Sequence, residues 1–286
     1  MNNRDYVSYR EGDWRLWALP DRWNRDLWLA VLDRINAQTP ARHPHVIRFR
    51  PADSNEGDPF YLKIFDRASW AGSMKDVFRG SKALRSLRQG RALSKRGFFV
   101  PTTVCAGEQR SCRWLRRSFV LTQAVRGQQL PLFLRDRLTS SMRTVALSEK
   151  RRLLKQVALE VRRLHDLGFV HGDLVPTNIF VCELAGAGIR IFFMDNDRTR
   201  RYPGWLPHSL WKRNLVQLNR LPLPGISLQD RMRFLRHYLG KQKWSTTDCR
   251  LLRWLEEKTR RRREECDHID ARVSFRQLMR WDEKNV

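Results

Sequence analysis

The amino-acid sequence predicts an α+β fold in which a small antiparallel sheet comes first and a mainly helical part follows. Two segments, 45–50 and 60–65, alternate apolar and polar residues and indicate paired strands. From about residue 126 onward, apolar residues recur at intervals of three and four, the period of amphipathic helices. A chain of 286 residues can bury a sizeable core and is long enough for one or two domains.

Residues 1–39 form a tryptophan-rich segment ahead of the sheet. Asp21 is placed to cap a helix whose apolar side chains fall on one side. We favour a helix that packs on the main body of the protein. The alternative is a helix that lies on a membrane surface, with four tryptophans at head-group depth: Trp14, Trp17, Trp23 and Trp28.

Further segments with a regular period complete the predicted organisation. A helix is expected over 81–95, and an apolar strand over 119–125 ends the sheet. Two later segments, 227–240 and 248–255, again show helical spacing. These elements predict three parts of the chain: an N-terminal helical extension (1–39), a sheet-containing domain (40–125) and a helical domain with basic C-terminal helices (126–286).

The chain is strongly basic, with 56 Lys and Arg against 30 Asp and Glu, a formal net charge of +26 and a pI of about 11.1. Such a charge attracts polyanions, whether nucleic acid, anionic lipid head groups or a phosphorylated glycolipid. Basic residues concentrate at 113–117, 198–201 and 258–263. The run at 258–263 by itself is more typical of a solvated helix face. The total excess nevertheless predicts a polyanionic partner.

Cysteine usage and hydropathy restrict the class of protein. The five cysteines are isolated, without a CxxC pair, and indicate reduced thiols in the cytosol instead of a disulfide framework or a zinc site. No stretch approaches the ~18 consecutive apolar residues of a transmembrane helix. The N-terminal residues lack the apolar core of a signal peptide.

The loop at 171–178, His-Gly-Asp-Leu-Val-Pro-Thr-Asn, carries the most specific chemical signal. It places Asn178 five residues after Asp173, and an apolar run ending in Asp195 follows. Phosphoryl transfer needs a carboxylate near the acceptor hydroxyl, together with oxygen ligands for Mg²⁺. These residue types at this spacing are typical of kinase-like catalytic loops.

The segments around this loop favour the same interpretation. A helix with regular apolar spacing precedes the loop, and Gly168 is expected to cap it. Two strands joined by a short linker follow, at 178–182 and 189–195. A hairpin of this length is expected to return Asp195 to the loop. A polar loop followed by an ordinary hairpin, without a catalytic role, is the less favoured alternative.

Lys63 lies in the strand 60–65 among apolar neighbours, 110 residues before Asp173. In a kinase-like small lobe, a lysine at this place contacts the α- and β-phosphates of the nucleotide. In the same layout the strand 119–125 leads into the hinge, whose backbone amides pair with adenine. We therefore predict three nucleotide-binding residues: Lys63, Gln123 and Val125.

Several short stretches, one of which reaches into the loop, carry a resemblance to a known family: 78–81, 96–102, 164–174, 194–198, 214–219 and 233–235. With these stretches the chain resembles the bacterial lipopolysaccharide core kinases, the Kdo/heptose kinase family. The resemblance spans roughly residues 45–240. Its most specific part is the loop with Gly172, at the position where common protein kinases carry arginine.

This resemblance implies a protein-kinase-like bilobal fold, with a small antiparallel-sheet N-lobe, a mainly helical C-lobe, and ATP and Mg²⁺ as cofactors. Asp173 would orient or deprotonate a sugar hydroxyl, and His171 would brace the loop. Asn178 and Asp195 would hold Mg²⁺, while Lys63 would hold the ATP phosphates.

Charged residues directly after Asp195 extend the candidate site. Asp197 is either a further metal ligand or a structural acceptor, and we favour the structural role. Three arginines are placed to meet a phosphorylated lipid or sugar: Arg198, Arg200 and Arg201.

Two departures from the kinase pattern concern Lys63. No Gly-x-Gly-x-x-Gly precedes it, and no Asp or Glu occurs from 77 to 107, where its usual glutamate partner would lie. Ser86 or Gln89 would stand at that place. We therefore expect Lys63 to be oriented by hydrogen bonds or by the nucleotide, and to matter less for activity than Asp195.

The implied function is ATP-dependent phosphorylation of a Kdo or heptose hydroxyl of the lipopolysaccharide inner core, at the cytoplasmic face of the inner membrane. The expected partners are the anionic glycolipid and the anionic membrane surface, without a dedicated nucleic-acid partner. Two alternatives stay open. A protein kinase of the same fold is disfavoured because no activation segment is recognisable. A nucleic-acid-binding protein on an inactive scaffold is disfavoured because the Asp-Asn-Asp set is retained.

Overall fold

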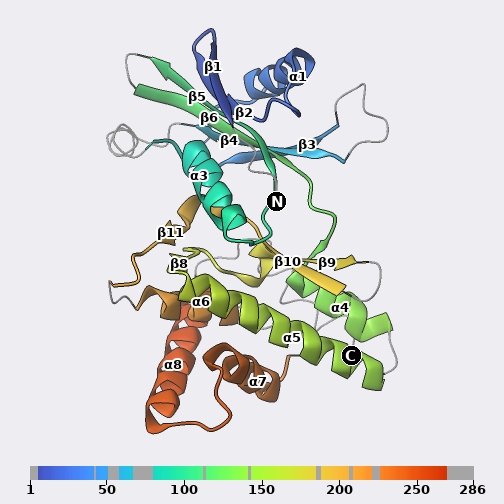
Figure 1. Cartoon of the computed structure of the whole chain (residues 1–286), viewed down its shortest axis with the longest axis vertical. Coiled ribbons are helices and arrows are strands. Elements are labelled where there is room, and N and C mark those ends of the chain that lie inside the picture. The colour runs from blue at the N-terminus through green and yellow to red at the C-terminus, as the bar shows by residue number, and fades with distance from the viewer. Residues whose placement is uncertain are drawn as a thin grey trace. The chain divides into compact units, whose positions relative to one another are not determined.

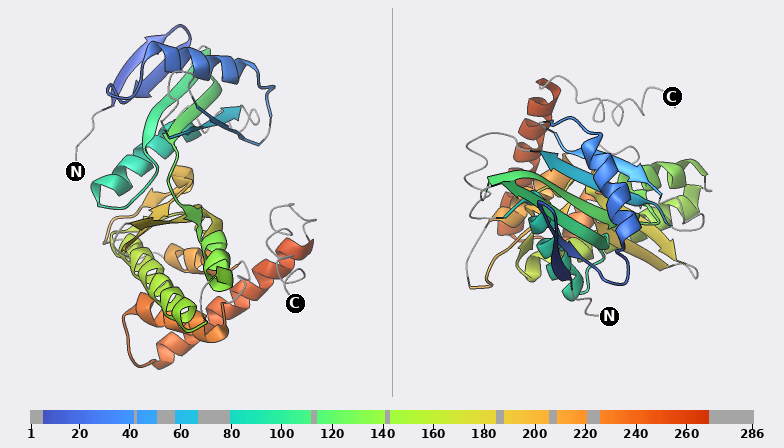
Figure 2. Two further views of the ribbon diagram at one scale, coloured as in Figure 1. Left: turned by 90° about the vertical axis from the view of Figure 1, so that its right-hand side faces the viewer. Right: turned by 90° about the horizontal axis from the view of Figure 1, so that it is seen from above.

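The computed structural model divides into two compact units, which are described separately (Figures 1 and 2). The first unit contains the chain up to Arg126 together with Phe193–Arg198, and the second contains Gly127–Phe192 and the chain from Thr199 onward. The structure describes residues 6–41, 43–50, 58–66, 80–111, 114–140, 143–184, 188–205, 209–220 and 226–268.

The first unit is built on a six-stranded sheet of order β1-β2-β5-β6-β4-β3, and all its neighbouring strands are antiparallel. The strands are β1 (Val7–Glu11), β2 (Trp14–Ala18), β3 (His45–Phe49), β4 (Phe60–Asp66), β5 (Thr103–Ser111) and β6 (Trp114–Gln123). The expected pair 45–50 and 60–65 is therefore confirmed as β3 and β4. The expected turn between them lies largely outside the described residues, since only Asp58 of 55–58 is included.

Two helices cover opposite faces of this sheet, as Figure 1 shows: α1 (Arg25–Asn36) and α3 (Lys82–Lys95). Successive residues of β6 point to opposite faces of the sheet. Phe119 packs in the hydrophobic core that includes α1, called the α1 core, whereas Val120 packs with Ala83 of α3. In β4, Leu62 and Ile64 belong to the α1 core. Lys63, between them, therefore lies on the α3 face.

The N-terminal 39 residues differ from the helical extension that we expected. They contribute two strands and one helix to the first unit, and the helix is capped by Asn24, whose side chain accepts from the Leu27 amide, instead of by Asp21. Trp14 and Trp28 are 5% and 6% exposed and pack edge to face in the core. The helix is therefore packed on the sheet, as favoured, and the membrane-surface alternative for these tryptophans is wrong.

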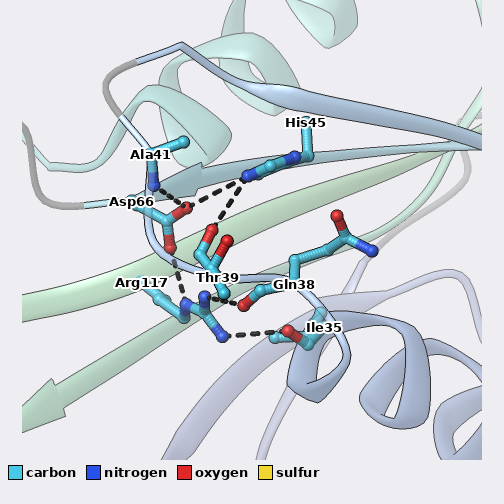
Figure 3. Close-up of polar contacts among 7 residues, drawn as sticks. All are labelled: Ile35, Gln38, Thr39, Ala41, His45, Asp66 and Arg117. Carbon is cyan, nitrogen blue, oxygen red and sulfur yellow. Dashed lines mark hydrogen bonds and ion pairs between the residues drawn. The ribbon is translucent and has the colours of Figure 1, made fainter.

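Arg117 and Asp66 tie the end of α1 to the sheet (Figure 3). The Arg117 guanidinium donates to the carbonyls of Ile35 (2.9 Å) and Gln38 (2.6 Å), and its Nε lies 2.6 Å from Asp66 Oδ1. The buried Asp66 also accepts from the Ala41 amide at 3.1 Å. Because Asp66 ends β4, this cluster fixes the strand that carries Lys63. The remaining members of the cluster are Thr39 and His45.

The start of α3 is fixed by a buried acid on the neighbouring strand. Glu108 of β5 accepts from the Ser81 amide at 2.8 Å, and the Ser81 hydroxyl accepts from the Leu84 amide at 3.1 Å as the N-cap. Burial acts to raise the pKa of Glu108, but hydrogen bonds from Arg110 and Ser81 outweigh it and lower the pKa. The predicted helix over 81–95 is thus confirmed.

Within the described residues, the second unit combines two small sheets with five helices (Figure 2). One sheet has the order β10-β9-β7, and the other pairs β11 with β8. The strands are β7 (Gln128–Gln129), β8 (Phe169–Val170), β9 (Ile179–Leu184), β10 (Gly188–Phe193) and β11 (Arg200–Arg201). The helices are α4 (Leu130–Ser140), α5 (Arg143–Asp166), α6 (Leu210–Asn219), α7 (Leu228–Leu239) and α8 (Thr246–His268).

Local signals in the sequence account for most of these boundaries. Gly168 follows α5 with φ of +80°, and Gly240 ends α7 with φ of +65°, both left-handed conformations that favour glycine. Ser227 and Asp230 form a capping box at the start of α7. The predicted hairpin is confirmed, since β9 and β10 are neighbours. Within the described ranges, no helix has both the length and the apolarity needed to cross a bilayer.

Candidate functional site

The predicted catalytic loop begins directly after β8 in the second unit. Gly172 has φ of +79°, a left-handed conformation that glycine adopts without steric strain. This backbone turn explains why the loop carries glycine between His171 and Asp173. A short 3-10 helix, Pro176–Asn178, closes the loop, and the Asn178 amide donates to the Val175 carbonyl at 2.9 Å.

Two side chains of α6 hold the backbone of this loop. Asn214 Oδ1 accepts from the His171 amide at 3.0 Å. Gln217 binds the loop twice, because its Oε1 accepts from the Leu174 amide at 3.1 Å and its Nε2 donates to the Gly172 carbonyl at 2.9 Å. The two side chains also bond to each other, from Asn214 Nδ2 to Gln217 Oε1 at 2.9 Å. The loop conformation is therefore set by neutral hydrogen bonds on both sides of Gly172.

His165 of α5 and Tyr238 of α7 support Asn214 from behind. His165 Nε2 lies 3.0 Å from Asn214 Oδ1, and its Nδ1 lies 2.9 Å from the Tyr238 hydroxyl. Because a carbonyl oxygen only accepts, Nε2 carries the hydrogen and Nδ1 accepts from the hydroxyl. Burial, and after it the nearby Asp166, raises the pKa of Tyr238 far above its usual range, so that this hydroxyl stays a donor.

Sequence reasoning missed Asn214 and Gln217 as functional residues and included them only as part of the stretch 214–219. Their contacts reach across 43 to 45 residues, which no local pattern reveals. One signal was available in the sequence: two amide side chains three residues apart share one face of a predicted helix.

Asp173 and Asn178 lie together in the loop, as predicted. The Asn178 side chain donates from Nδ2 to the Asp173 carbonyl at 2.9 Å. This bond fixes the amide orientation, so Oδ1 is the atom with which Asn178 would ligate a metal ion. Both residues are partly exposed, whereas His171 is fully buried. The Thr199 hydroxyl donates to the His171 carbonyl at 3.3 Å, in agreement with a bracing role for this residue.

Lys63 and Asp195 form an ion pair in the first unit, with Nζ 2.6 Å from Oδ1. We expected Lys63 to lack a carboxylate partner, and this expectation is wrong, because the partner lies 132 residues away, far from the acid-free segment that we searched. Asp195 has φ of +53°, a left-handed conformation that is rare outside glycine. Such strain typically persists at functional sites. Asp195 and Lys63 are 38% and 23% exposed, so both can meet a ligand.

Asp197 adds a second carboxylate to this pair. Burial and then the charge of Asp195 raise the pKa of Asp197, while the cations Lys63, Arg198 and Lys82 oppose the rise. The neighbouring Asn196 is buried and donates to the Phe193 carbonyl at 2.9 Å, which anchors the turn. The first unit therefore holds two coupled carboxylates beside lysine side chains. The predicted convergence of Asp195 with the loop of the second unit stays a prediction.

Of the two predicted adenine-binding residues, Gln123 ends β6 and Val125 lies two residues beyond it. The Gln123 amide donates to the Thr102 carbonyl at 2.9 Å, so this N–H is engaged in the first unit, and a role in adenine binding would pass to the Gln123 carbonyl. The Gln123 side chain accepts from Arg22 and lies 3.5 Å from Asp58. Val125 follows and is partly exposed.

The predicted substrate arginines fall into both units. Arg198 is exposed in the first unit, and Arg200 and Arg201 are exposed on β11 of the second. The Arg201 guanidinium lies 5.7 Å from the centre of the Phe169 ring, which orients it on the neighbouring strand β8.

The second unit also contains an apolar cavity of about 520 Å³ that sequence reasoning did not predict. It lies among α5, α6, α7 and α8, and arginines stand among its lining residues. Arg263 donates to the carbonyls of Asn219 (2.7 Å) and Arg220 (3.0 Å). Burial, and then the charge of Arg263, lowers the pKa of Arg231. The cavity is lined by residues that include Leu154, Val157, Leu215, Leu218, Leu235, Leu255, Arg231, Arg260 and Arg263.

The chain is similar to solved structures, and the likeness to WaaP shows the fold. WaaP, solved in a complex with acyl carrier protein, matches with a TM-score of 0.60 and 22% identity, over 85% of this chain and 96% of that chain. The kinase domain of Mycobacterium tuberculosis PknI, solved as a double mutant, matches with a TM-score of 0.39 and 15% identity, over 77% of this chain and 92% of that chain. A search of curated proteins gave no significant relative.

The family comparison confirms the resemblance that the motifs suggested. The family model described as lipopolysaccharide kinase (Kdo/WaaP) family matches residues 67–238, which is more than half of the chain. The matched range includes the loop 171–178, Asp195 and the α6 residues that hold the loop. The chain therefore belongs to the lipopolysaccharide kinase (Kdo/WaaP) family, has a protein-kinase-like α+β fold, and is a phosphotransferase that acts on a sugar of the lipopolysaccharide core.

Proposed function

We propose that this kinase transfers the γ-phosphoryl group of ATP to a hydroxyl of Kdo or heptose in the lipopolysaccharide inner core, at the cytoplasmic face of the inner membrane. The observation that carries the proposal is the loop 171–178. Its backbone is fixed by Asn214 and Gln217, and it presents the partly exposed Asp173. The family of the chain supplies the substrate class.

Asp173 is the group that acts on the acceptor. Its carboxylate accepts a hydrogen bond from the sugar hydroxyl and orients the oxygen towards the γ-phosphorus. It takes the proton as the new P–O bond forms and the bond from the γ-phosphorus to the bridging oxygen breaks, which releases ADP. Asp173 follows Gly172, whose backbone is held through the Gln217 contact to its carbonyl. The backbone that carries Asp173 is thus held before the acceptor binds, which reduces the entropy lost in reaching the reactive geometry.

The residues present fit a magnesium ion bound to ATP. Asn178 offers an amide oxygen and Asp195 a carboxylate, the hard oxygen ligands that Mg²⁺ prefers. Burial, and after it the neighbouring Asp195 charge, raises the pKa of Asp197, and a cation bound beside the two carboxylates would oppose this rise. When bound, Mg²⁺ would neutralise phosphate charge and orient the transferred group. We assign Asn178 and Asp195 as its protein ligands.

Lys63 holds the donor phosphates in this proposal. Its ammonium is already oriented by Asp195 at 2.6 Å, so the nucleotide meets a lysine in a defined position. Adenine binds the backbone near Gln123 and Val125. Arg198, Arg200 and Arg201 bind the anionic groups of the acceptor, for which guanidinium groups are well suited.

The mass of the lipopolysaccharide core tests the proposed function. A strain that lacks this gene would be complemented with the wild-type chain or with Asp173→Ala. We expect the wild type to restore one phosphate, a gain of about 80 Da, and the variant to leave the core without it. Fragmentation of the restored core then assigns the phosphate to Kdo or to heptose. An identical core in all three strains contradicts the proposed function.

We also propose an acyl carrier protein as a protein partner of this kinase. WaaP was solved in a complex with acyl carrier protein. The apolar cavity of about 520 Å³ is large enough for part of an acyl chain, and its arginines suit an anionic carrier.

A thermal-shift measurement separates specific from charge-driven binding of the carrier. We expect an acylated carrier to raise the melting temperature and the same carrier without an acyl chain to raise it less. Leu218→Trp, which fills part of the cavity, should remove the difference between the two carriers. An equal shift from both carriers would mean that no acyl chain enters the cavity.

A further inference from the structure

The segment after β11 carries an unusually exposed tryptophan. Trp205 is 81% exposed, the largest value among the exposed large apolar side chains of the described residues. This value contrasts with Trp14 and Trp28, which are at most 6% exposed. Figure 1 shows the chain after β11 running along the periphery of the second unit. A single exposed apolar side chain is common on soluble proteins, so the surroundings of Trp205 decide its meaning.

The tip of this segment stands in open solvent. Pro203 and Gly204 are both exposed, and a Cβ added at Gly204 would meet no atom within 4 Å. A bulky side chain at such a tip has little packing to gain within the second unit. An indole combines a large apolar body with one N–H donor, which suits the boundary between lipid and water.

The base of the segment, in contrast, is fixed to the strand that precedes the catalytic loop. Arg200 pairs with Val170 and Arg201 with Phe169. The Tyr202 amide donates to the Gly168 carbonyl at 2.8 Å. The segment therefore has a base fixed by hydrogen bonds and an exposed tip, as expected of an element that docks on another surface. Because His171 follows Val170 directly, this base is continuous with the proposed catalytic loop.

The charge of the surrounding sequence is of one sign. From 199 to 229 the chain contains no Asp or Glu. Exposed cations of this stretch include Arg200 and Arg201 beside the tip, and Arg213 on α6. Basic residues next to an interfacial tryptophan are typical of binding to anionic lipid head groups. The Lys and Arg residues of the stretch are Arg200, Arg201, Lys212, Arg213 and Arg220.

We propose that the segment Arg200–Trp205 docks this kinase on an anionic lipid surface. Trp205 enters the head-group region, and Arg200 and Arg201 bind phosphates of the lipid surface, in addition to the anionic groups of the acceptor to which the proposed function assigns them. The occupant of this surface is the bilayer that contains the acceptor glycolipid, so the physiological meaning of the docking rests on the proposed function. Since β11 pairs with β8, docking holds the catalytic loop at a fixed height over the bilayer.

Vesicle sedimentation tests the docking without ATP or acceptor, and therefore independently of the proposed function. Vesicles of phosphatidylglycerol and phosphatidylethanolamine would be compared with vesicles of phosphatidylcholine. We expect the full chain to bind the anionic vesicles and to be released by high salt. Trp205→Ala should weaken binding about tenfold or more, because the indole buries a large apolar area. Arg200→Gln and Arg201→Gln should each weaken it about fivefold.

Matched control variants distinguish binding by the segment Arg200–Trp205 from binding by any exposed apolar or basic side chain. Leu29→Ala removes an exposed apolar side chain from α1, and Arg250→Gln with Arg253→Gln removes two exposed cations from α8. We expect these controls to bind vesicles like the wild type. Trp205→Phe, which keeps an aromatic ring, should restore part of the lost binding. Wild-type binding by Trp205→Ala, or equal losses in the controls, would overturn the docking proposal.

Activity on two forms of the acceptor gives a second readout for Trp205→Ala. Phosphorylation of the core glycolipid in vesicles should fall with vesicle binding, while phosphorylation of a soluble, delipidated core should stay near the wild-type rate. Equal losses on both acceptors would place Trp205 in the active site and overturn the docking proposal. Failure of the wild type on both acceptors would count against the proposed function and leave the vesicle result to decide the docking.

Discussion

The loop 171–178 of the second unit and the Lys63–Asp195 cluster of the first unit are organised in opposite ways. The loop is held by neutral hydrogen bonds from Asn214 and Gln217, and its conformation needs no ligand. The cluster is held by charge. Asp195, which has φ of +53°, forms an ion pair with Lys63, with 2.6 Å between Oδ1 and Nζ. Burial is the larger cause of the raised pKa of Asp197, and the charge of Asp195 is the second.

This difference separates two tasks of a kinase. The loop must present one carboxylate in one position, and a neutral scaffold achieves this at any ionic strength. The cluster must accept highly charged ligands. Asp195 is accordingly partly exposed, and the pKa of Asp197 is raised although three cations lie near it. We expect a change at Lys63 to alter nucleotide binding, the loss of the proposed metal ligand Asp195 to abolish turnover, and changes around the loop to lower turnover without altering nucleotide binding.

The largest effect is expected from the cluster. Asp195→Ala should lower kcat by about a thousandfold or more, because a proposed metal ligand is lost. Lys63→Ala should lower kcat/KM by about tenfold to a hundredfold and act mainly on the KM for ATP, since the proposed metal ligands remain. Steady-state kinetics at varied ATP would measure both. Equally complete losses in the two variants would show that Lys63 is as essential as Asp195.

A smaller effect is expected from the scaffold of the loop. Asn214→Ala removes the acceptor of the buried His171 amide, which should cost about 1–3 kcal/mol of folding free energy. Turnover should fall about tenfold to a hundredfold with little change in the KM for ATP, because the loop loses its fixed conformation. Asn214→Asp keeps the acceptor oxygen and should recover part of the turnover. A rise in KM with unchanged kcat would contradict a positioning role.

A third prediction concerns the free energy of unfolding at acid pH and a buried ion pair that lies in neither the loop nor the Lys63–Asp195 cluster. Lys150 and Asp230 are buried with 2.8 Å between Nζ and Oδ2. Burial acts to raise the pKa of Asp230, but hydrogen bonds from Lys150 and Ser227 outweigh it and lower the pKa. Because the folded pKa is lowered, this stabilisation is present above the unfolded pKa of about 3.9 and is lost as pH falls through the folded value.

The double variant Lys150→Met/Asp230→Leu should therefore lose less stability between pH 7 and pH 3 than the wild type does. Apolar replacement of a buried pair is often close to neutral, but Asp230→Leu also removes the capping box of α7, so stability at pH 7 should fall by about 1–2 kcal/mol. Urea unfolding at several pH values would measure both quantities. Identical pH profiles would mean that Asp230 does not contribute to acid unfolding.

Local patterns predicted much of the fold. The helix at 81–95, the hairpin after the loop and the helix ends at Gly168 and Gly240 all follow from capping residues or a regular period. The strand β2 was missed, although its alternation of buried and exposed residues is regular, because residues 1–39 were predicted as a helical extension. Asp21 was predicted as the helix cap, and Asn24, which forms the cap, was not identified.

The candidate site was predicted less completely, since it depends on contacts between distant residues. The loop and Asp195 were recognisable from residue type and spacing. The Lys63–Asp195 pair and the Asn214–His171 bond join residues that are 132 and 43 positions apart. A search confined to one segment therefore found no carboxylate for Lys63. The exposure of Trp205 was equally hidden, because burial of the other tryptophans appears only in the folded chain.

The rate of phosphate transfer by Asp173→Asn tests the central claim most directly. The purified wild type and the variant would be given ATP, Mg²⁺ and a soluble core oligosaccharide, and the product would be detected by mass. We predict that Asp173→Asn keeps the melting temperature of the wild type and transfers phosphate at least about a hundredfold more slowly, since it cannot take the proton of the acceptor. Transfer at the wild-type rate by the folded variant would contradict the assignment of Asp173 as the group that activates the sugar hydroxyl.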